Sequence, residues 1–140
     1  MIKIDSTDLN KFSVILGKLP DEIKDDVRKV VKNSAFNIER NAKSSASVKT
    51  GHLRRSISTK MGDMEATIHT SNLKYAPMVE FGTKPHIIRA KNKKALYWKG
   101  AKHPVKSVRH PGGKAKPYLI PAFEKEKDQF LEKLKEVIEW

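Results

Sequence analysis

Residues that could carry out chemistry are few in this sequence, and none stands at a spacing typical of a catalytic or metal site. Histidines are the natural metal ligands, but no two of them have the i, i+4 or His-x-Glu spacing that brings two ligands to one ion. The five are His52, His69, His86, His103 and His110. The chain contains no cysteine, which excludes disulfides and thiolate ligands. We therefore expect no metal site and no cofactor.

Carboxylates and glycine-rich turns are the other candidates for chemistry. Glu65, Glu80 and Glu124 lie too far apart in the sequence for an acid–base pair to be argued. Glu80 stands alone in the apolar stretch YAPMVEFG, where we expect a structural role, either bonding backbone amides or pairing with an arginine. The stretch HPGGK lacks the spacing and the strand-to-helix context of a phosphate loop. We expect no catalytic residue and no enzymatic activity.

Positive charge is concentrated in one segment, residues 83–118. The net charge of the whole chain is +13, and no acid occurs between Glu80 and Glu124. Eleven basic residues fall within this segment: Lys84, Arg89, Lys91, Lys93, Lys94, Lys99, Lys102, Lys106, Arg109, Lys114 and Lys116. Such a block either faces a polyanion or forms an extended arm that stays solvated until a partner arrives.

The length of 140 residues is typical of one domain, so we expect a single domain over residues 1–140. The longest apolar runs fall well short of the roughly 20 residues that a membrane-spanning helix needs. We therefore expect a soluble, unsecreted protein without a membrane contact.

Three segments have the apolar periodicity of helices. Leu9 to Leu19 repeats at helical spacing, with Ser6 or Thr7 as a possible N-cap. Pro20 and the two acids after it favour the start of a long helix, whose apolar face continues to about Ala42. A third helix is predicted to open at Pro121 and to run to the C-terminal end.

Alternation with a period of two predicts strands between these helices. Residues 53–61 and 64–71 form a hairpin in this reading, joined by a type II′ turn at Gly62-Asp63. Further short strands are predicted for HIIRA with ALYW, and for PVKSVR. The pattern predicts an α+β fold, with a small antiparallel sheet packed by a long helix in the N-terminal half and by a C-terminal helix.

Aromatic residues within the basic segment suggest that it could bind nucleic acid. Tyr97, Trp98 and Tyr118 are interleaved with lysines, a composition typical of a surface that tracks phosphates and stacks bases. Because Tyr97 and Trp98 are neighbours in a strand-like run, we expect one of them to pack on the core. The sequence contains no recognised nucleic-acid-binding motif.

Four motifs in order resemble a known family. They are KTGHLRRSI, YAPMVEFGT, KKALYW and VRHPGGKAKPYLIPAFEK. Together they resemble the tail-completion or head–tail connector (neck) proteins of long-tailed phages and prophages, and the resemblance covers almost the whole chain. One departure is that SSASVKTG lacks the proline expected shortly before Thr-Gly, which alters the exit from the long helix.

This resemblance implies an α+β subunit without catalytic residues that assembles into a ring between portal and tail. The partners it implies are further copies of the chain, adjacent neck and tail proteins, and DNA in the channel. It implies a location in the virion, at the junction of neck and tail, and in the host cytoplasm during assembly. The alternative is a stand-alone nucleic-acid-binding protein that uses residues 83–118.

Residues 75–82 are expected to form the base of this arm. We predict a short helical turn in which Tyr75, Met78, Val79 and Phe81 clamp onto the sheet, and which ends at Gly82 in the left-handed conformation. Glu80 belongs to the same structural hinge. From this hinge, residues 83–118 protrude as a basic arm, which returns to the body at PYLIPAF.

Overall fold

The computed structural model describes residues 17–49, 51–71 and 73–138. The elements in chain order are α2 (Asp21–Ser45), α3 (His52–Ser56), β1 (Ile57–Met61), β2 (Ala66–Thr70), α4 (Ala76–Phe81), β3 (His86–Arg89), β4 (Ser107–His110) and α5 (Leu119–Ile138). The helix expected from Leu9 onward lies, up to residue 16, outside the described residues. The α+β class is confirmed, although the strands form two separate two-stranded sheets rather than one.

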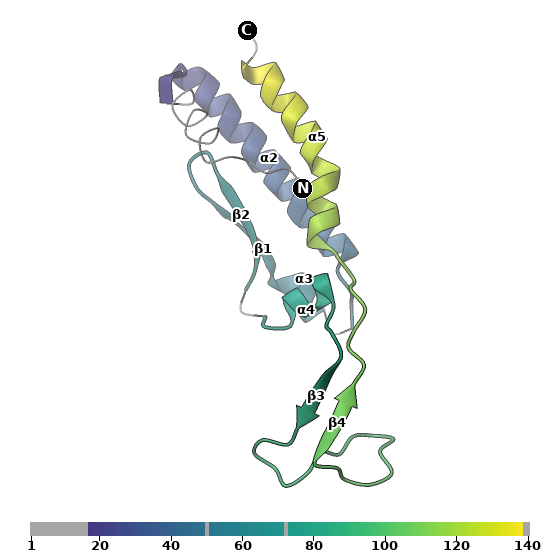
Figure 1. Ribbon diagram of the computed structural model, residues 1–140. Coiled ribbons are helices and arrows are strands. Elements are labelled where there is room, and N and C mark those ends of the chain that lie inside the picture. Colours follow the sequence, from purple (N-terminus) through teal and green to yellow (C-terminus); the bar gives the residue numbers. More distant parts are fainter. Residues whose placement is uncertain (1–16, 50, 72, 139–140) are drawn as a thin grey trace.

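The body of the molecule is built around α2, which runs beside α5 and carries the β1–β2 hairpin (Figure 1). As predicted, α2 starts directly after Pro20, with Asp21 and Glu22 at the positive end of the helix dipole. Its buried residues, among them Val27 and Ile38, recur at helical spacing and face the other elements. A partly buried polar contact also joins the two long helices, because Asn37 donates a hydrogen bond of 3.1 Å to the buried Glu126.

The β1–β2 hairpin exists as predicted, but both its start and its turn differ from the prediction. Residues His52–Ser56 form α3 instead of the beginning of the strand, which lets Leu53 point into the core with 4% of its surface exposed. The register runs from Ile57 opposite Thr70 to Met61 opposite Ala66. Because Gly62 N–H donates to Glu65 O at 2.8 Å, the two loop residues are 63 and 64, one position later than predicted. Gly62 is not among the glycines with positive φ, so the type II′ turn predicted at Gly62-Asp63 does not form.

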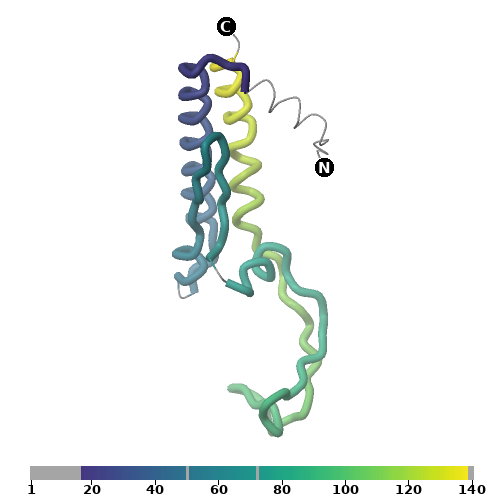
Figure 2. Tube along the Cα trace, turned by 90° about the vertical axis from the view of Figure 1, so that its left-hand side faces the viewer, coloured from purple at the N-terminus to yellow at the C-terminus, as the bar shows by residue number. Residues whose placement is uncertain are grey.

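Residues 83–118 leave the body as an extended arm (Figure 1), which curves to one side below it (Figure 2). Of the short strands predicted in this segment, HIIRA forms β3 and the end of PVKSVR forms the start of β4; the two pair with each other, from His86 opposite His110 to Arg89 opposite Ser107. A bridge between Thr83 and Gly113 continues the same register toward the body. Farther out, Leu96 pairs with Val105, and this bridge is the only β pairing of the ALYW segment among the described residues.

The core lies at the lower end of the body, where α2, α3, β1, α4 and the start of α5 meet. Its buried members are Ile38, Ala42, Ala46, Leu53, Ile57, Ala76, Tyr118 and Ala122. Ile57 is fully buried, and Tyr118 has 2% of its surface exposed. Within the described ranges, no helix is both long and apolar enough to cross a membrane.

Candidate functional site: the arm and its base

Glu80 joins the base of the arm to the start of α5. It is 6% exposed, and its carboxylate accepts hydrogen bonds from the N–H groups of Tyr118, Leu119 and Ile120 at 2.8, 3.0 and 2.9 Å. The first N–H groups of a helix have no partner within the helix, and a carboxylate there also faces the positive end of its dipole. The next residue, Pro121, has no N–H to satisfy. Of the two structural roles expected for Glu80, bonding backbone amides is the one observed.

This cap explains why α5 begins at Leu119, two residues before the predicted start at Pro121. The N–H groups that would be unpaired in that extra half-turn are bonded by Glu80. Burial, and secondly the charge of Glu80, raise the pKa of the Tyr118 phenol. The chain returning from the arm is tied to α4 as well, because Lys116 N–H donates to Val79 O at 2.8 Å.

The short helix α4 forms where the helical turn was predicted, but most of the expected clamp is wrong. Ala76 and Val79 pack on the core, whereas Tyr75, Met78 and Phe81 are 41%, 55% and 69% exposed. These three residues share the face opposite Ala76 and Glu80, and a helix of six residues cannot turn both faces inward. The exposed face of α4 is therefore an apolar surface at the root of the arm.

Gly82 ends α4 with φ 72° and ψ −177°. The positive φ was predicted, but the ψ value places the residue in an extended region open essentially to glycine alone, rather than in the left-handed helical region. A Cβ at this position would lie 2.7 Å from the carbonyl oxygen of Gly113 and 2.8 Å from the nitrogen of Ala115. Glycine at position 82 thus allows the outgoing and returning strands of the arm to approach each other.

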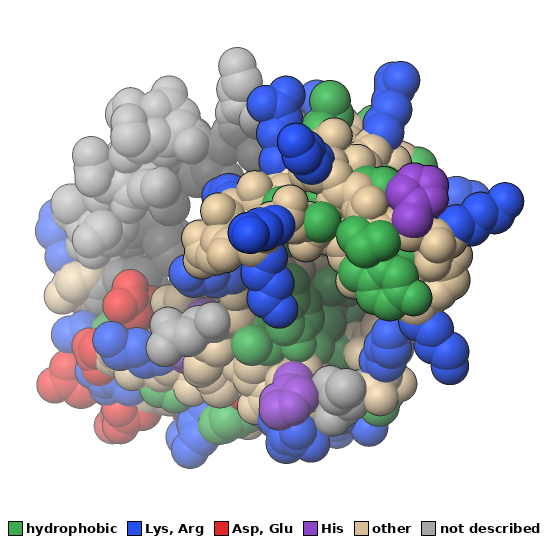
Figure 3. Space-filling model, turned by 90° about the horizontal axis from the view of Figure 1, so that it is seen from below, with side chains coloured by type: hydrophobic (Ala, Val, Ile, Leu, Met, Phe, Trp, Pro, Cys, Tyr) green, Lys and Arg blue, Asp and Glu red, His purple; other side chains and the backbone are tan. Residues whose placement is uncertain are grey.

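All eleven basic residues predicted as the contact surface are exposed along the arm. Among the described residues, none of them forms an ion pair, since the ion pairs present lie within the body. Viewed from below, Lys and Arg side chains project around the arm, hydrophobic side chains line the hollow beside it, and the acidic side chains in view lie away from it (Figure 3). The arm therefore presents unpaired positive charge and apolar groups together.

Both aromatic residues in the outer part of the arm face solvent. Tyr97 is 69% exposed and Trp98 is 46% exposed, so the expectation that one of them packs on the core is wrong. The reason is that β3 and β4 pack mainly on each other, away from the core. Tyr118, in contrast, belongs to the core and not to the basic surface.

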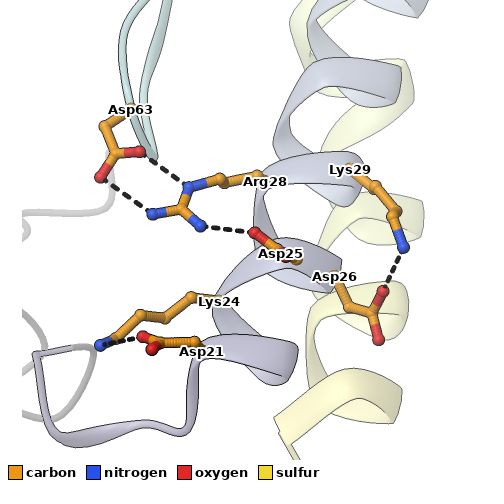
Figure 4. Close-up of polar contacts among 7 residues, drawn as sticks. All are labelled: Asp21, Lys24, Asp25, Asp26, Arg28, Lys29 and Asp63. Carbon is orange, nitrogen blue, oxygen red and sulfur yellow. Dashed lines mark hydrogen bonds and ion pairs between the residues drawn. The ribbon is translucent and has the colours of Figure 1, made fainter.

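Two polar links in the body were not predicted. Arg28 of α2 bonds Asp63 at the tip of the β1–β2 hairpin, with 2.7 Å between Nε and Oδ1, and also Asp25 at 2.6 Å (Figure 4). The hydrogen bond from Arg28 holds the pKa of Asp63 below its usual value. Glu39 bonds Lys43 and the hydroxyl of Thr59, both at 2.5 Å, and so joins α2 to β1. Arg28 and Glu39 each have one partner within α2, but Asp63 and Thr59 lie 20 or more residues away in the sequence. Local sequence patterns therefore do not identify these two links.

A third unpredicted feature is an open apolar groove between the β1–β2 hairpin and α5, with α2 as its floor. It has a volume of about 950 Å³ and adjoins a smaller hollow of about 340 Å³. Ile38, Ile68, Phe123 and Glu124 line both parts. Ser34 also lines the groove, and its buried hydroxyl has no hydrogen-bond partner among the described residues. Within the same residues, no three His, Asp or Glu side chains are grouped so that they could hold a metal ion.

Comparison with protein families identifies the class of protein. The family model described as "Bacteriophage HK97-gp10, putative tail-component" matches residues 10–82, more than half of the chain. The chain belongs to this family of HK97-gp10-like phage tail components. The match ends at Gly82, so the arm and α5 lie beyond it. No match was found among curated proteins or solved structures.

Proposed function

We propose that this phage tail component is a non-enzymatic structural protein that helps to join the DNA-filled head to the tail. It acts as a single domain, in a homo-oligomeric ring at the junction of neck and tail, after assembly in the host cytoplasm. Its partners are copies of itself and adjacent neck and tail proteins. Family membership supports the structural role, and the arm supports the role in joining.

The arm is the observation that carries the proposal. An isolated two-stranded hairpin is at best marginally stable in water, and this one projects away from the body without a core of its own. It also exposes Ile87, Tyr97 and Trp98 among unpaired lysines and arginines. Exposed apolar groups and unpaired charges on one protrusion are typical of a surface that another molecule covers during assembly.

The proposal is tested by reversing the charge of Lys91, Lys93 and Lys94 to Glu in the corresponding phage. Because all three are exposed and unpaired in the described structure, the fold should remain intact. Electron microscopy should then show DNA-filled heads and separate tails. The control reverses three exposed lysines of the body, Lys32, Lys49 and Lys60, which changes the net charge equally and should leave complete particles. Normal particles from the arm variant would contradict the proposal.

A second candidate function is supported by the exposed pair Tyr97 and Trp98 beside the lysines, which could stack on bases while the lysines contact phosphates. In this case the free subunit should bind duplex DNA with a log–log salt slope of about −0.9 per phosphate contact, several units in all. We expect only weak binding, because one arm offers few simultaneous contacts. Tight binding by a monomer, together with normal particles from the arm variant, would favour this function.

A further inference from the structure

An acidic stripe runs along the exposed side of α5. Glu124, Asp128, Glu132 and Glu136 follow at intervals of four residues and are all exposed. Like charges at this spacing destabilise a helix. No ion pair compensates the stripe within the described residues. Lys125, Lys127 and Lys135 each stand three residues from a member of the stripe but form no ion pair with it in the described structure, so its carboxylates remain available to a partner.

The stripe borders the apolar groove described above, since Glu124 lines both of its parts. Beside it, Ile120 is 47% exposed, Phe123 50% and Leu131 44%. Glu124 is the member of the stripe that lines the groove, whose lining also includes Glu126 and Lys127. The stripe turns away from the groove by about 40° at each step of four residues. The surface on this side of the body thus combines an apolar groove with carboxylates that begin at its edge. A ligand that covers it needs apolar groups next to positive charges.

One face of the arm has this composition. Ile87 lies directly opposite Arg109 in the β3–β4 ladder, and Arg89 follows two residues after Ile87, so these three side chains share a face. Ile87 is 59% exposed. The face presents an isoleucine flanked by two guanidinium groups, and arginine is well suited to bidentate pairing with carboxylates.

The spacing of charges on the two surfaces is similar. Successive carboxylates of the stripe are four residues apart, a rise of about 6 Å along the helix at 1.5 Å per residue. From Ile87 to Arg89 the strand spans about 7 Å, at 3.3 Å per residue. The arm of a given chain extends away from its own α5 (Figures 1 and 2), so the arm that covers the stripe must come from another molecule.

We propose that the face of the arm formed by Ile87, Arg89 and Arg109 binds along α5 of a second copy of the chain. Ile87 packs against Phe123 at the groove, and the two arginines pair with Glu124, Asp128 and Glu132. This inference rests on the proposed function, for which it names the contact between ring subunits. DNA would neutralise the arm but leave the groove open and the stripe unpaired, whereas a second copy covers all three surfaces.

The arm and the stripe are different surfaces of one chain, so a copy can offer its arm to one neighbour and its α5 to another. Such contacts are heterologous and head-to-tail, and they close into a ring when the rotation between subunits allows it. Two copies that exchanged arms reciprocally would instead form a symmetric dimer. A ring is the arrangement that agrees with the proposed function.

The absence of native cysteine permits a direct test by site-specific cross-linking. Equimolar Ile87→Cys and Phe123→Cys proteins, mixed and oxidised, should yield a disulfide-linked heterodimer as the main product. The matched control replaces Phe123→Cys by Val48→Cys, which lies on an exposed residue outside the groove. Equal heterodimer yields from the two mixtures would overturn the proposal.

Charge reversal provides an independent test, measured as association by sedimentation velocity at low salt. The arm variant, Arg89→Glu with Arg109→Glu, and the stripe variant, Glu124→Lys with Asp128→Lys and Glu132→Lys, should each self-associate at least about tenfold more weakly than the parent. Mixing the two variants should restore association, because each reversed arm then meets a reversed stripe. A folded mixture that associates no better than the single variants would overturn the proposal.

These experiments separate the contact from the function. If the heterodimer forms but phage with Lys91, Lys93 and Lys94 reversed to Glu assemble normally, the contact stands and the proposed role in joining fails. If particles fail to join while cross-linking matches the control, the arm serves the proposed function through a different protein. If the variant with Arg89→Glu and Arg109→Glu only reduces DNA binding and leaves self-association unchanged, the contact is wrong and a nucleic acid is the ligand.

Discussion

The body and the arm of this protein are held together by different interactions. In the body, α2, α5 and the β1–β2 hairpin share a core, and charged links such as Arg28 to Asp63 join elements distant in sequence. The arm has a ladder of backbone hydrogen bonds, exposed lysines and arginines, and no buried large side chain between Thr83 and Pro117. Substitutions in the body should therefore change stability, whereas substitutions along the arm should change binding. Glu80 and Gly82 stand where the two regions meet.

Replacement of Glu80 by Ala should have the largest effect on stability. The carboxylate is buried and accepts three backbone N–H groups, which would lose their partner at the start of α5. We expect the free energy of unfolding to fall by about 3 kcal/mol or more, measured by urea denaturation. Glu124→Ala is the matched control, since that residue is exposed and should change stability by less than about 0.5 kcal/mol. Equal effects of the two substitutions would show that the cap does not hold the regions together.

Gly82→Ala should have the next largest effect, at the junction itself. The added Cβ would meet backbone atoms of Gly113 and Ala115 and would also impose strain at positive φ. We expect a loss of about 2 kcal/mol or more, measured by thermal unfolding. Gly100→Ala carries the strain without the clash, because φ is 100° but no atom lies within 4 Å, and it should cost about 1 kcal/mol.

Limited trypsin digestion measures how easily the arm opens next to this junction. In the parent, the first cuts should fall within residues 86–116, because few apolar contacts anchor this lysine-rich segment. Gly82→Ala should accelerate these cuts, and Gly100→Ala should affect them less. First cleavage within α2 would contradict the division of the molecule into a stable body and a labile arm.

Acid should weaken the body through Glu39. Hydrogen bonds from Lys43, and secondly from Thr59, hold the pKa of Glu39 below its ordinary value of 4.5. A depressed pKa in the folded state adds stability above pH 4.5, and this stability is lost as the pH falls through the folded pKa. Glu39→Gln should therefore lower stability near neutral pH by no more than about 1 kcal/mol. The difference from the parent should shrink on acidification, measured by urea denaturation at several pH values.

Charge reversal at Lys91, Lys93 and Lys94 should have the smallest effect on stability. The three side chains are exposed and form no ion pair in the described structure. We expect a change below about 0.5 kcal/mol in thermal unfolding of the isolated subunit. A larger loss would mean that the arm contributes to the fold of its own chain, and the contrast between the two regions would fail.

Local sequence patterns were sufficient for the long elements and for the position of the arm. The apolar period of α2, the alternation of the β1–β2 hairpin and the glycine at position 82 each depend on neighbours a few residues away. The exposure of the eleven basic residues could be predicted for the same reason, since a block of charge without acids is solvated whatever the fold around it. Their role as a contact surface stays a prediction. The β1–β2 turn was misplaced by one residue because glycine at position 62 suggested a turn type that the backbone does not adopt.

The contacts between segments far apart in the sequence were decided only by the tertiary structure. Glu80 was recognised as structural, but its partners at Tyr118 to Ile120 lie about 40 residues away, and they also determine where α5 begins. The outward direction of Tyr75, Met78, Phe81, Tyr97 and Trp98 depends on the absence of a layer above them, which no local periodicity records. The groove between β2 and α5 exists because the β1–β2 sheet has only two strands and does not reach across to α5. Periodicity shows which side chains are apolar, whereas the packing of distant elements determines which of them remain uncovered.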